Sequence, residues 1–342
     1  MKICRVSEEV YAQTIQQSHS TFKSFPQRKE FVDGELKKYV ELSNISLSEV
    51  DDVKKVAHQH QHNHWEVKQD MDCYLTDNPY IGWLLHLKGV PFVFDYIDMY
   101  SLMVSREFEN DEEKYTFTRY CETMSVKYCI GLILQSGDLE RQFSDVKVPK
   151  QVIPNGVDIE RFKSTIVPKS EKFRLVFVGK ITEWYASLQN VCEAVRGLDV
   201  EFKVIGDGGL RKEIEEKSPP NVEFVGAVPY EDVPKWMNSA DVCMFCVDDG
   251  SPVVIGEYCA CGKPIITLKG KIEWLLKNSE NGLLVYDTAQ EFRQAIITMK
   301  DDERLRTECS DANRVLSERL DWKVLVKRYA DFIKECVTRE AV

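Results

Sequence analysis

Short apolar runs typical of β-strands recur from residue 72 to residue 286, and helical stretches separate them. Strands that are apolar along most of their length indicate parallel sheets covered by helices on both faces. The runs fall into two series, so we expect two doubly wound α/β domains. The first series is 72–77, 90–96, 129–135 and 150–154, and the second is 173–179, 200–206, 221–226, 241–247, 263–268 and 281–286.

The 342 residues are enough for two domains, each with its own core. An opening strand is expected near residues 2–6, and the polar stretch 158–172 indicates the join between the domains. Between them, residues 7–70 are polar and weakly periodic, with helical candidates near 8–18 and 47–57. The predicted divisions are a first domain at 1–160, a second at 161–318, and an amphipathic helix in 319–342 that packs back on the first domain.

Composition excludes several classes of protein. The net charge of −11 argues against general nucleic-acid binding and against electrostatic adhesion to an anionic membrane. No stretch reaches the roughly 18 apolar residues of a spanning helix, and the N-terminus "MKICRVSEEV" lacks the apolar core of a signal peptide. The 11 cysteines are scattered and are interpreted as small buried hydrophobes in a reducing compartment, so the protein is expected to be cytoplasmic.

The segment "DDGSPVVIGEYCACGKPII", residues 248–266, predicts a short helix with an anion-binding start. Ser251 can cap the free amides, Pro252 suits the first helical position, and Gly262 ends the helix. The helix is therefore expected at about 252–261. Its unpaired amides and the positive end of its dipole suit an anion or sugar hydroxyls.

Glu257 is a carboxylate inside this otherwise apolar helix. Burying a lone carboxylate costs several kcal/mol unless donors satisfy it. The two hydroxyls of a ribose would serve, and Asp249, just before the helix, would then reach the hexose end of the same ligand. The alternative is that Glu257 pairs with a buried lysine or arginine.

Several motifs resemble the retaining glycosyltransferase family 4. They are two acids separated by seven residues, Asp249 and Glu257, followed by "YCACGKPII", together with 151–162, 175–181, 203–216, 221–245 and 280–285 in the family's order. The resemblance implies the GT-B fold, in which two Rossmann-like domains of doubly wound parallel sheet face a cleft. It covers roughly residues 125–335, and 70–125 less closely.

The resemblance also implies roles for individual residues. Lys180, in a loop with Gly179 and Glu183, would neutralise the donor diphosphate, and Glu257 would hold the ribose. Backbone groups of Val225 and Gly226 would meet the nucleobase. The remaining donor-binding positions are Gly206 and Gly208, which shape a loop, and Asp249, Gly250, Ser251, Pro252 and Val253, which surround the hexose and phosphates.

Lys180 stands where the family more often has arginine, and no glycine pair follows the first strand. Three further positions depart from the family pattern. Tyr185 stands where a second diphosphate-binding lysine is usual, so Arg211 is a candidate to supply the missing charge. Asp249 stands where glutamate is usual. Ile97 stands where a histidine is usual, while Asp98 remains, in an Asp-x-x-Asp arrangement with Asp95. Asp98 is interpreted either as a residue near the reacting carbon or the acceptor hydroxyl, or as a helix N-cap.

Two further stretches have two interpretations each. "HQHQHNH", residues 58–64, could bind a metal in a strand, but an exposed helix end or loop is favoured. Residues 22–31 interleave aromatic and basic residues, as in a loop that contacts an acceptor or a membrane, although a solvated turn explains them as well.

The expected activity is transfer of a hexose from a UDP- or GDP-sugar to a hydroxyl of a glycan or lipid-linked saccharide, with retention of anomeric configuration. Asp98, Lys180 and Asp249 are the expected catalytic residues, and no metal or other cofactor is expected. The alternatives are a non-catalytic partner that binds nucleotide sugar, and a GT-B epimerase or phosphorylase. Contact with the inner membrane face is compatible with this activity. The sequence does not fix the base, sugar or acceptor.

Overall fold

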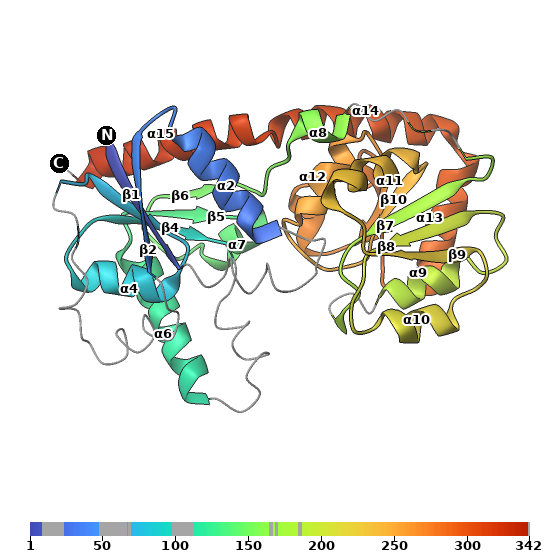
Figure 1. Ribbon diagram of the computed structural model, residues 1–342, viewed down its shortest axis with the longest axis horizontal. Helices are drawn as coiled ribbons and strands as arrows, with labels where there is room; N and C mark the ends of the chain where they lie inside the picture. Colours follow the sequence, from blue (N-terminus) through green and yellow to red (C-terminus); the bar gives the residue numbers. More distant parts are fainter. Residues whose placement is uncertain are drawn as a thin grey trace. The chain divides into compact units, whose positions relative to one another are not determined.

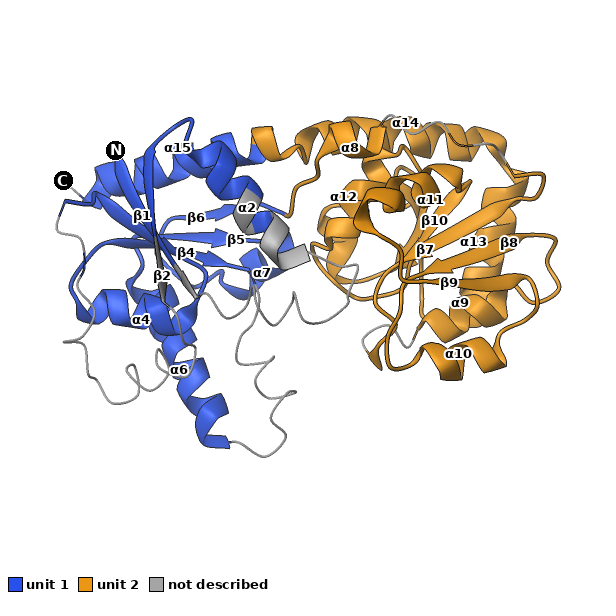
Figure 2. Cartoon of the chain, viewed as in Figure 1, with its two compact units in different colours: residues 1–18, 26–154, 325–342 blue, residues 19–25, 155–324 orange. Residues whose placement is uncertain are grey.

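The computed structural model describes residues 1–8, 24–47, 67, 70–97, 112–163, 167, 170–183 and 187–340. The chain divides into two compact units (Figure 2). Unit 1 takes its described residues from 1–18, 26–154 and 325–342, and unit 2 from 19–25 and 155–324. The chain passes from unit 1 to unit 2 between Pro154 and Asn155, whereas the sequence places the domain limit at residue 160.

Unit 1 contains a six-stranded parallel sheet with the strand order β2-β1-β3-β4-β5-β6. Its strands are β1 (Lys2–Glu8), β2 (Glu41–Leu47), β3 (Cys73–Thr76), β4 (Phe92–Tyr96), β5 (Gly131–Leu134) and β6 (Lys150–Val152). Its helices are α4 (Pro79–Leu87), α6 (Glu112–Tyr128) and α7 (Gly137–Gln142), together with α2 (Ser24–Leu36) from Pro26 onward and α15 (Trp322–Glu340) from Leu325 onward.

Helices cover both faces of this sheet (Figure 1). On one face, side chains of β3 and β4 such as Tyr74 and Phe92 pack with Leu84 of α4 and Cys121 of α6 in one core cluster. On the other face, α15 approaches β5 so closely that a side chain at Gly131 would meet Phe332 and Cys336. Burial on both faces explains why these strands are apolar along most of their length.

Unit 2 contains a second six-stranded parallel sheet, with the order β12-β11-β10-β7-β8-β9. Its strands are β7 (Arg174–Val178), β8 (Glu201–Ile205), β9 (Val222–Gly226), β10 (Val242–Phe245), β11 (Ile265–Leu268) and β12 (Gly282–Val285). Its helices are α8 (Ile159–Lys163), α9 (Leu188–Ala194), α10 (Arg211–Lys217), η3 (Tyr230–Asp232), α11 (Val233–Ser239), α12 (Val253–Ala260), η4 (Lys271–Trp274), α13 (Ala289–Asp301) and α14 (Glu303–Arg319).

Alternate residues of β7 enter different cores. Phe177 packs with residues of α9 and α13, and Val178 packs with residues of α11 and α12. Figure 1 shows α9 on one side of this sheet and α11 and α12 on the other. Unit 2 is therefore a three-layer, doubly wound α/β structure.

The predicted fold class is confirmed, because each of the ten apolar runs contains a strand and both sheets are parallel. The sequence did not predict β2 or α2. Residues 24–31 of the stretch interpreted as a loop or turn are helical, so that interpretation was wrong. The helical candidates 8–18 and 47–57 and the histidine stretch 58–64 lie outside the described residues, except for Leu47, which ends β2. Among the described helices, none has both the length and the apolar character needed to cross a bilayer.

A buried ion pair connects α2 to the sheet of unit 1. The guanidinium of Arg28 lies 3.0 Å from the carboxylate of Asp95 in β4, and both side chains are at most 3% exposed. Arg28 also donates to the carbonyl oxygens of Ile153 and Pro154, where the chain leaves β6. The ion pair and the hydrogen bonds offset the cost of burying the Arg28 charge. They explain how the basic stretch 22–31 can contribute to a helix that packs on the core.

We expect Asp95→Asn to lower the free energy of unfolding by about 4 kcal/mol, because it leaves Arg28 buried without its counter-ion. The matched control is Asp331→Asn, which removes an exposed pair with Lys327 and is expected to cost about 0.5 kcal/mol or less. Urea unfolding of the full chain measures both values. Equal losses in the two variants would contradict this account of the ion pair.

Candidate functional site

The strand order of unit 2 creates one position where ligands commonly bind. Connections run from β7 toward β8 and β9 on one side, and toward β10, β11 and β12 on the other. The carboxyl ends of β7 and β10 therefore form a topological switch point, where a crevice opens in such sheets. The register pairs Phe177 with Met244, so the segments after β7 and β10, which hold Lys180 and Asp249, leave the sheet side by side.

Glycines allow the loops at this edge to approach one another closely. Gly206 has φ +141°, and a Cβ there would lie 1.8 Å from the carbonyl oxygen of Gly179. A Cβ at Gly208, with φ +157°, would lie 2.3 Å from the carbonyl oxygen of Ile181. Gly206 also donates to the carbonyl of Gly226 over 2.9 Å. The β7 and β8 loops consequently pack backbone against backbone, while the donor-binding role of Gly206 and Gly208 stays a prediction.

Side-chain hydrogen bonds hold the loop between β10 and α12. Asp249 accepts a bond of 2.9 Å from the Ser251 amide, and the Gly250 carbonyl accepts one of 2.6 Å from the Trp274 indole. Asn155 donates through its backbone amide to the Ser251 hydroxyl and through its side chain to the Ser251 carbonyl, at 3.0 and 2.7 Å. The loop is thereby fixed from segments far away in the sequence.

Helix α12 spans Val253–Ala260, within one residue of the prediction at each end, but its start differs in detail. Pro252 is the N-cap residue, and no side chain caps the helix. The predicted capping role of Ser251 is therefore wrong, because its hydroxyl accepts the Asn155 amide instead. The first amides of α12 consequently keep no side-chain partner, and they carry the positive end of the helix dipole.

Helix α12 is attached to the two central strands by the residue that follows Glu257. The buried Tyr258 hydroxyl accepts from the Val178 amide over 3.0 Å and donates to the Met244 carbonyl over 3.2 Å. A side chain at Gly256 would meet Val157 at 3.3 Å. These contacts fix the orientation of α12 around Glu257.

Glu257 is 5% exposed, and its Oε1 accepts a hydrogen bond of 2.7 Å from the Tyr230 hydroxyl. Tyr230 lies in η3 after β9, and the Arg161 guanidinium lies over its ring, 4.8 Å from the ring centre. Within the described part of the chain, no lysine or arginine forms an ion pair with Glu257. The alternative of a carboxylate paired with a buried cation is thus not found among these residues.

Burial raises the pKa of Glu257 from 4.5 to about 7, while the Tyr230 hydrogen bond and the positive charge of Arg161 lower it in part. Additional hydrogen-bond donors would stabilise the ionised form of a buried carboxyl group with such a raised pKa. Perturbed carboxyl groups of this kind are concentrated at functional sites.

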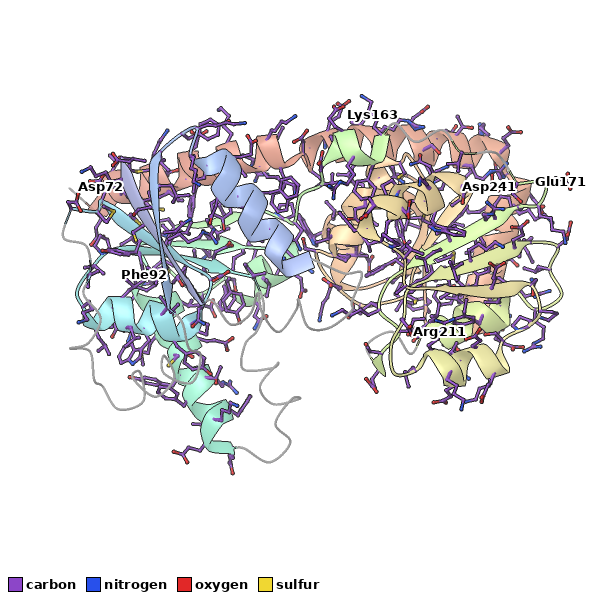
Figure 3. All side chains as sticks on the ribbon, viewed as in Figure 1. Asp72, Phe92, Lys163, Glu171, Arg211 and Asp241 are labelled. Carbon is purple, nitrogen blue, oxygen red and sulfur yellow. The ribbon has the colours of Figure 1, made fainter. Side chains whose placement is uncertain are left out.

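The predicted cationic residues differ in their surroundings. Lys180 is exposed and forms no ion pair with a described residue, so its ammonium is available to a ligand. Arg211, labelled near α10 in Figure 3, bonds the carbonyl of Phe224 at 3.2 Å and lies 3.2 Å from Glu215. Its guanidinium thus links α10 to β9. Glu183 is exposed, while Tyr185 lies outside the described residues.

In unit 1, the structure places only part of the predicted site. Asp95 is fully buried in its pair with Arg28, and Ile97 is 5% exposed. Asp98 lies outside the described residues. No group of three His, Cys, Asp or Glu side chains suited to a metal occurs among the residues that were placed, so the expected metal independence stays a prediction.

Three residues of the site were not singled out in the sequence, namely Tyr230, Asn155 and Trp274. Tyr230 and Asn155 lie within the motifs 221–245 and 151–162, so the motifs indicated the right segments. Their partners are 27 and 96 positions away, which local spacing does not reveal.

Comparison with known proteins finds similarities in sequence and in structure. Residues 172–302 match the family described as Glycosyl transferases group 1. An uncharacterized glycosyltransferase of Methanocaldococcus jannaschii is 26% identical over 221 residues, which cover 61% of this chain and 60% of that protein. The chain thus spans three fifths of the length of this curated relative.

Solved structures identify the fold. Anabaena HepE, determined with UDP and glucose, superposes with a TM-score of 0.69 at 17% identity, over 98% of this chain and 99% of its own. Sucrose-phosphate synthase from Thermosynechococcus elongatus gives a TM-score of 0.73 at 15% identity, over 99% and 100% of the two chains. The chain has the GT-B fold, as the sequence predicted.

Gly206→Ala is expected to lower the free energy of unfolding by about 3 kcal/mol, because the new methyl group would collide with the Gly179 carbonyl and strain the backbone. The control is Gly209→Ala, where the added carbon meets nothing within 4 Å. Thermal and urea unfolding compare the two variants. If Gly206→Ala were as stable as Gly209→Ala, the close packing of the β7 and β8 loops would be refuted.

The raised pKa of Glu257 predicts a pH-dependent stability. The unfolded chain releases this proton near pH 4.5 and the folded chain near pH 7, so the stability contributed by Glu257 falls as pH rises through that interval. In Glu257→Gln this fall is absent. Relative to wild-type, we expect the free energy of unfolding of the variant to rise by about 2 kcal/mol between pH 5 and pH 8. Urea unfolding at each pH measures this difference. Parallel pH profiles for the two proteins would show that Glu257 titrates normally.

Proposed function

We propose that this protein is a glycosyltransferase that moves a hexose from a nucleotide diphosphate sugar to a hydroxyl of a saccharide or lipid-linked acceptor, with retention of anomeric configuration. The observation that carries the proposal is Glu257, a buried carboxylate at the switch point of unit 2 whose hydrogen-bond donor among the described residues is Tyr230. The match of residues 172–302 to Glycosyl transferases group 1 supports it.

In this proposal, Tyr230 and Glu257 hold the ribose together. Tyr230 binds Oε1 of Glu257, which leaves Oε2 as the acceptor for ribose hydroxyl donors. Arg161 lies over the Tyr230 ring and Phe162 packs against its edge, so the phenol is held in position. The nucleobase would lie against the backbone of Val225 and Gly226, at the carboxyl end of β9.

The diphosphate would lie between Lys180 and the start of α12. Lys180 follows β7, and the amides of the first turn of α12 have no side-chain cap. Amides that are fixed before the ligand arrives stabilise the charge that develops on a leaving phosphate without reorganising. Gly250, Ser251 and Pro252 belong to a loop that hydrogen bonds already hold, which supports a preorganised site.

The bond from the anomeric carbon to the phosphate oxygen would break while the acceptor oxygen bonds to the same face of that carbon. The phosphate oxygen that leaves would take the acceptor proton, so no pair of catalytic carboxylates is needed, in contrast to glycosidases. Asp249 would bind hexose hydroxyls, and Asp98 would act near the reacting centre. We propose that this chemistry needs no metal or other cofactor.

A non-catalytic nucleotide-sugar-binding protein is the second candidate, because Tyr185 occupies the place of a second diphosphate-binding lysine. Both candidates bind the donor, so turnover separates them. Hydrolysis of UDP-glucose, measured with and without EDTA, distinguishes an enzyme from a binding partner and tests the proposed metal independence.

UDP is the first ligand to test, because Anabaena HepE was solved with it. We expect wild-type to bind UDP, and Glu257→Gln to lose affinity about tenfold or more, since a ribose hydroxyl would lose a charged acceptor. Tyr230→Phe should lose about threefold to tenfold, because only the orientation of Glu257 is impaired. Isothermal titration calorimetry measures these affinities, with GDP as the competing nucleotide.

The control for this titration is Glu318→Gln, which changes an exposed glutamate of α14 that forms no ion pair with a described residue. It should bind UDP as wild-type does. UDP binding that is equal in Glu257→Gln and Glu318→Gln would remove the central support of the proposal.

A further inference from the structure

Unit 1 contains a groove of about 690 Å³ between α6 and the segment that joins α7 to β6. The aromatic rings of Tyr96 and Phe143 line it, with ring centres 5.0 Å apart and planes at 74°. Tyr96 is the last residue of β4, so the groove reaches the carboxyl edge of the sheet. Lys127 and Lys147 lie just before the amino ends of β5 and β6, so the groove runs along one face of the sheet.

Three cations line the groove, and none forms an ion pair with a described residue. Arg119 and Lys127 come from α6, and Lys147 comes from the opposite wall. Arg119 donates to the Tyr115 hydroxyl over 3.2 Å, and Lys127 lies 5.0 Å from the centre of the Tyr128 ring, so neither charge is neutralised by these contacts. Because two acids, Glu122 and Asp145, also line the groove, its three cations leave one net positive charge, which in a chain of net charge −11 suits a single anionic group.

The remaining lining groups suit a sugar. Glu122 and Asp145 are the two acids of the groove, and Thr123 and Gln142 add neutral polar groups. Such groups bind hydroxyls, while aromatic faces pack on the C–H groups of a sugar ring. The volume lies in the range of sites for small organic ligands, about 300–1,000 Å³.

We propose that this groove binds a saccharide that carries an oxyanion, either a phosphate or a carboxylate, as the acceptor. The assignment as acceptor rests on the proposed glycosyltransferase function, whereas the binding of an anionic sugar does not. Arg119, Lys127 and Lys147 supply the positive charge that attracts the oxyanion, and the half-buried Phe143 contacts the ring.

A membrane surface is the competing occupant, and the structure favours the sugar. Membrane-binding surfaces expose large apolar side chains beside their cations. In the described part of unit 1, the exposed large hydrophobic residues are Tyr120 and Tyr128, and neither lines the groove. Tyr96 is 3% exposed and Phe143 is half-buried, so the groove presents no protruding aromatic ring to a bilayer.

The test is a calorimetric titration of the full chain with glucose 6-phosphate, glucuronate, glucose and inorganic phosphate. We expect glucose 6-phosphate, glucuronate or both to bind about tenfold or more tightly than glucose and phosphate, because the groove recognises the ring and the charge together. Which of the two binds better separates a phosphorylated acceptor from a uronate.

Variants locate the binding. Arg119→Ala and Lys147→Ala should each weaken binding of the preferred anionic sugar about tenfold, which corresponds to one lost charged contact. Lys334→Ala, which removes an exposed lysine of α15 outside the groove, should bind as wild-type does. All three changes are at exposed positions, and thermal unfolding confirms that each variant is folded. UDP affinity should be unchanged in all three.

Several results would overturn the inference: no binding of either anionic sugar by wild-type, equal affinity for free phosphate, or unchanged affinity in Arg119→Ala and Lys147→Ala. Binding only to phosphatidylglycerol vesicles would assign the groove to a membrane and also refute it. If wild-type binds the anionic sugar but not UDP, the groove stands as a saccharide site, while its role as an acceptor site and the proposed function fail.

Discussion

The carboxylate of Glu257 stays inside unit 2 because two tyrosines fix its surroundings. Tyr258 attaches α12 to β7 and β10, and Tyr230 donates to the carboxylate from the segment after β9. The two contacts bring together the ends of three strands around one buried acid. Burial raises the pKa of that acid and thereby lowers the stability of the free protein at neutral pH. A ligand with hydroxyl donors would offset this cost, so Glu257 is suited to bind the hydroxyls of a ribose.

Rigid loops around Glu257 complete this arrangement. Gly206 and Gly208 allow the β7 and β8 loops to pack without intervening side chains, and Asn155 fixes Ser251 before any ligand is bound. In unit 1, by contrast with Glu257 in unit 2, the buried carboxylate of Asp95 is neutralised by the guanidinium of Arg28. A carboxylate that is neutralised in this way supports the fold, whereas one that lacks an internal cation, as Glu257 does among the described residues, is suited to a ligand.

Much of the fold was predictable because parallel strands that are buried on both faces leave long apolar runs in the sequence. The same reasoning missed β2, whose sequence "ELSNISL" alternates at the edge of its sheet. It also missed α2, whose Arg28 is buried in an ion pair with a residue 67 positions away. At the site, Glu257 was found from its local pattern, and the loop glycines Gly206 and Gly208 from the family resemblance. Tyr230, Asn155 and the true partner of Ser251 were not, because those contacts join distant segments.

The central claim is that Glu257 receives the ribose of a nucleotide donor. A crystal structure of the protein with UDP tests it most directly. The account predicts a ribose hydroxyl oxygen within about 3 Å of the Glu257 carboxylate, with the Tyr230 hydroxyl still bonded to it and the diphosphate at the start of α12. A structure in which UDP lies elsewhere, or in which Glu257 contacts protein groups alone while UDP is bound, would contradict it.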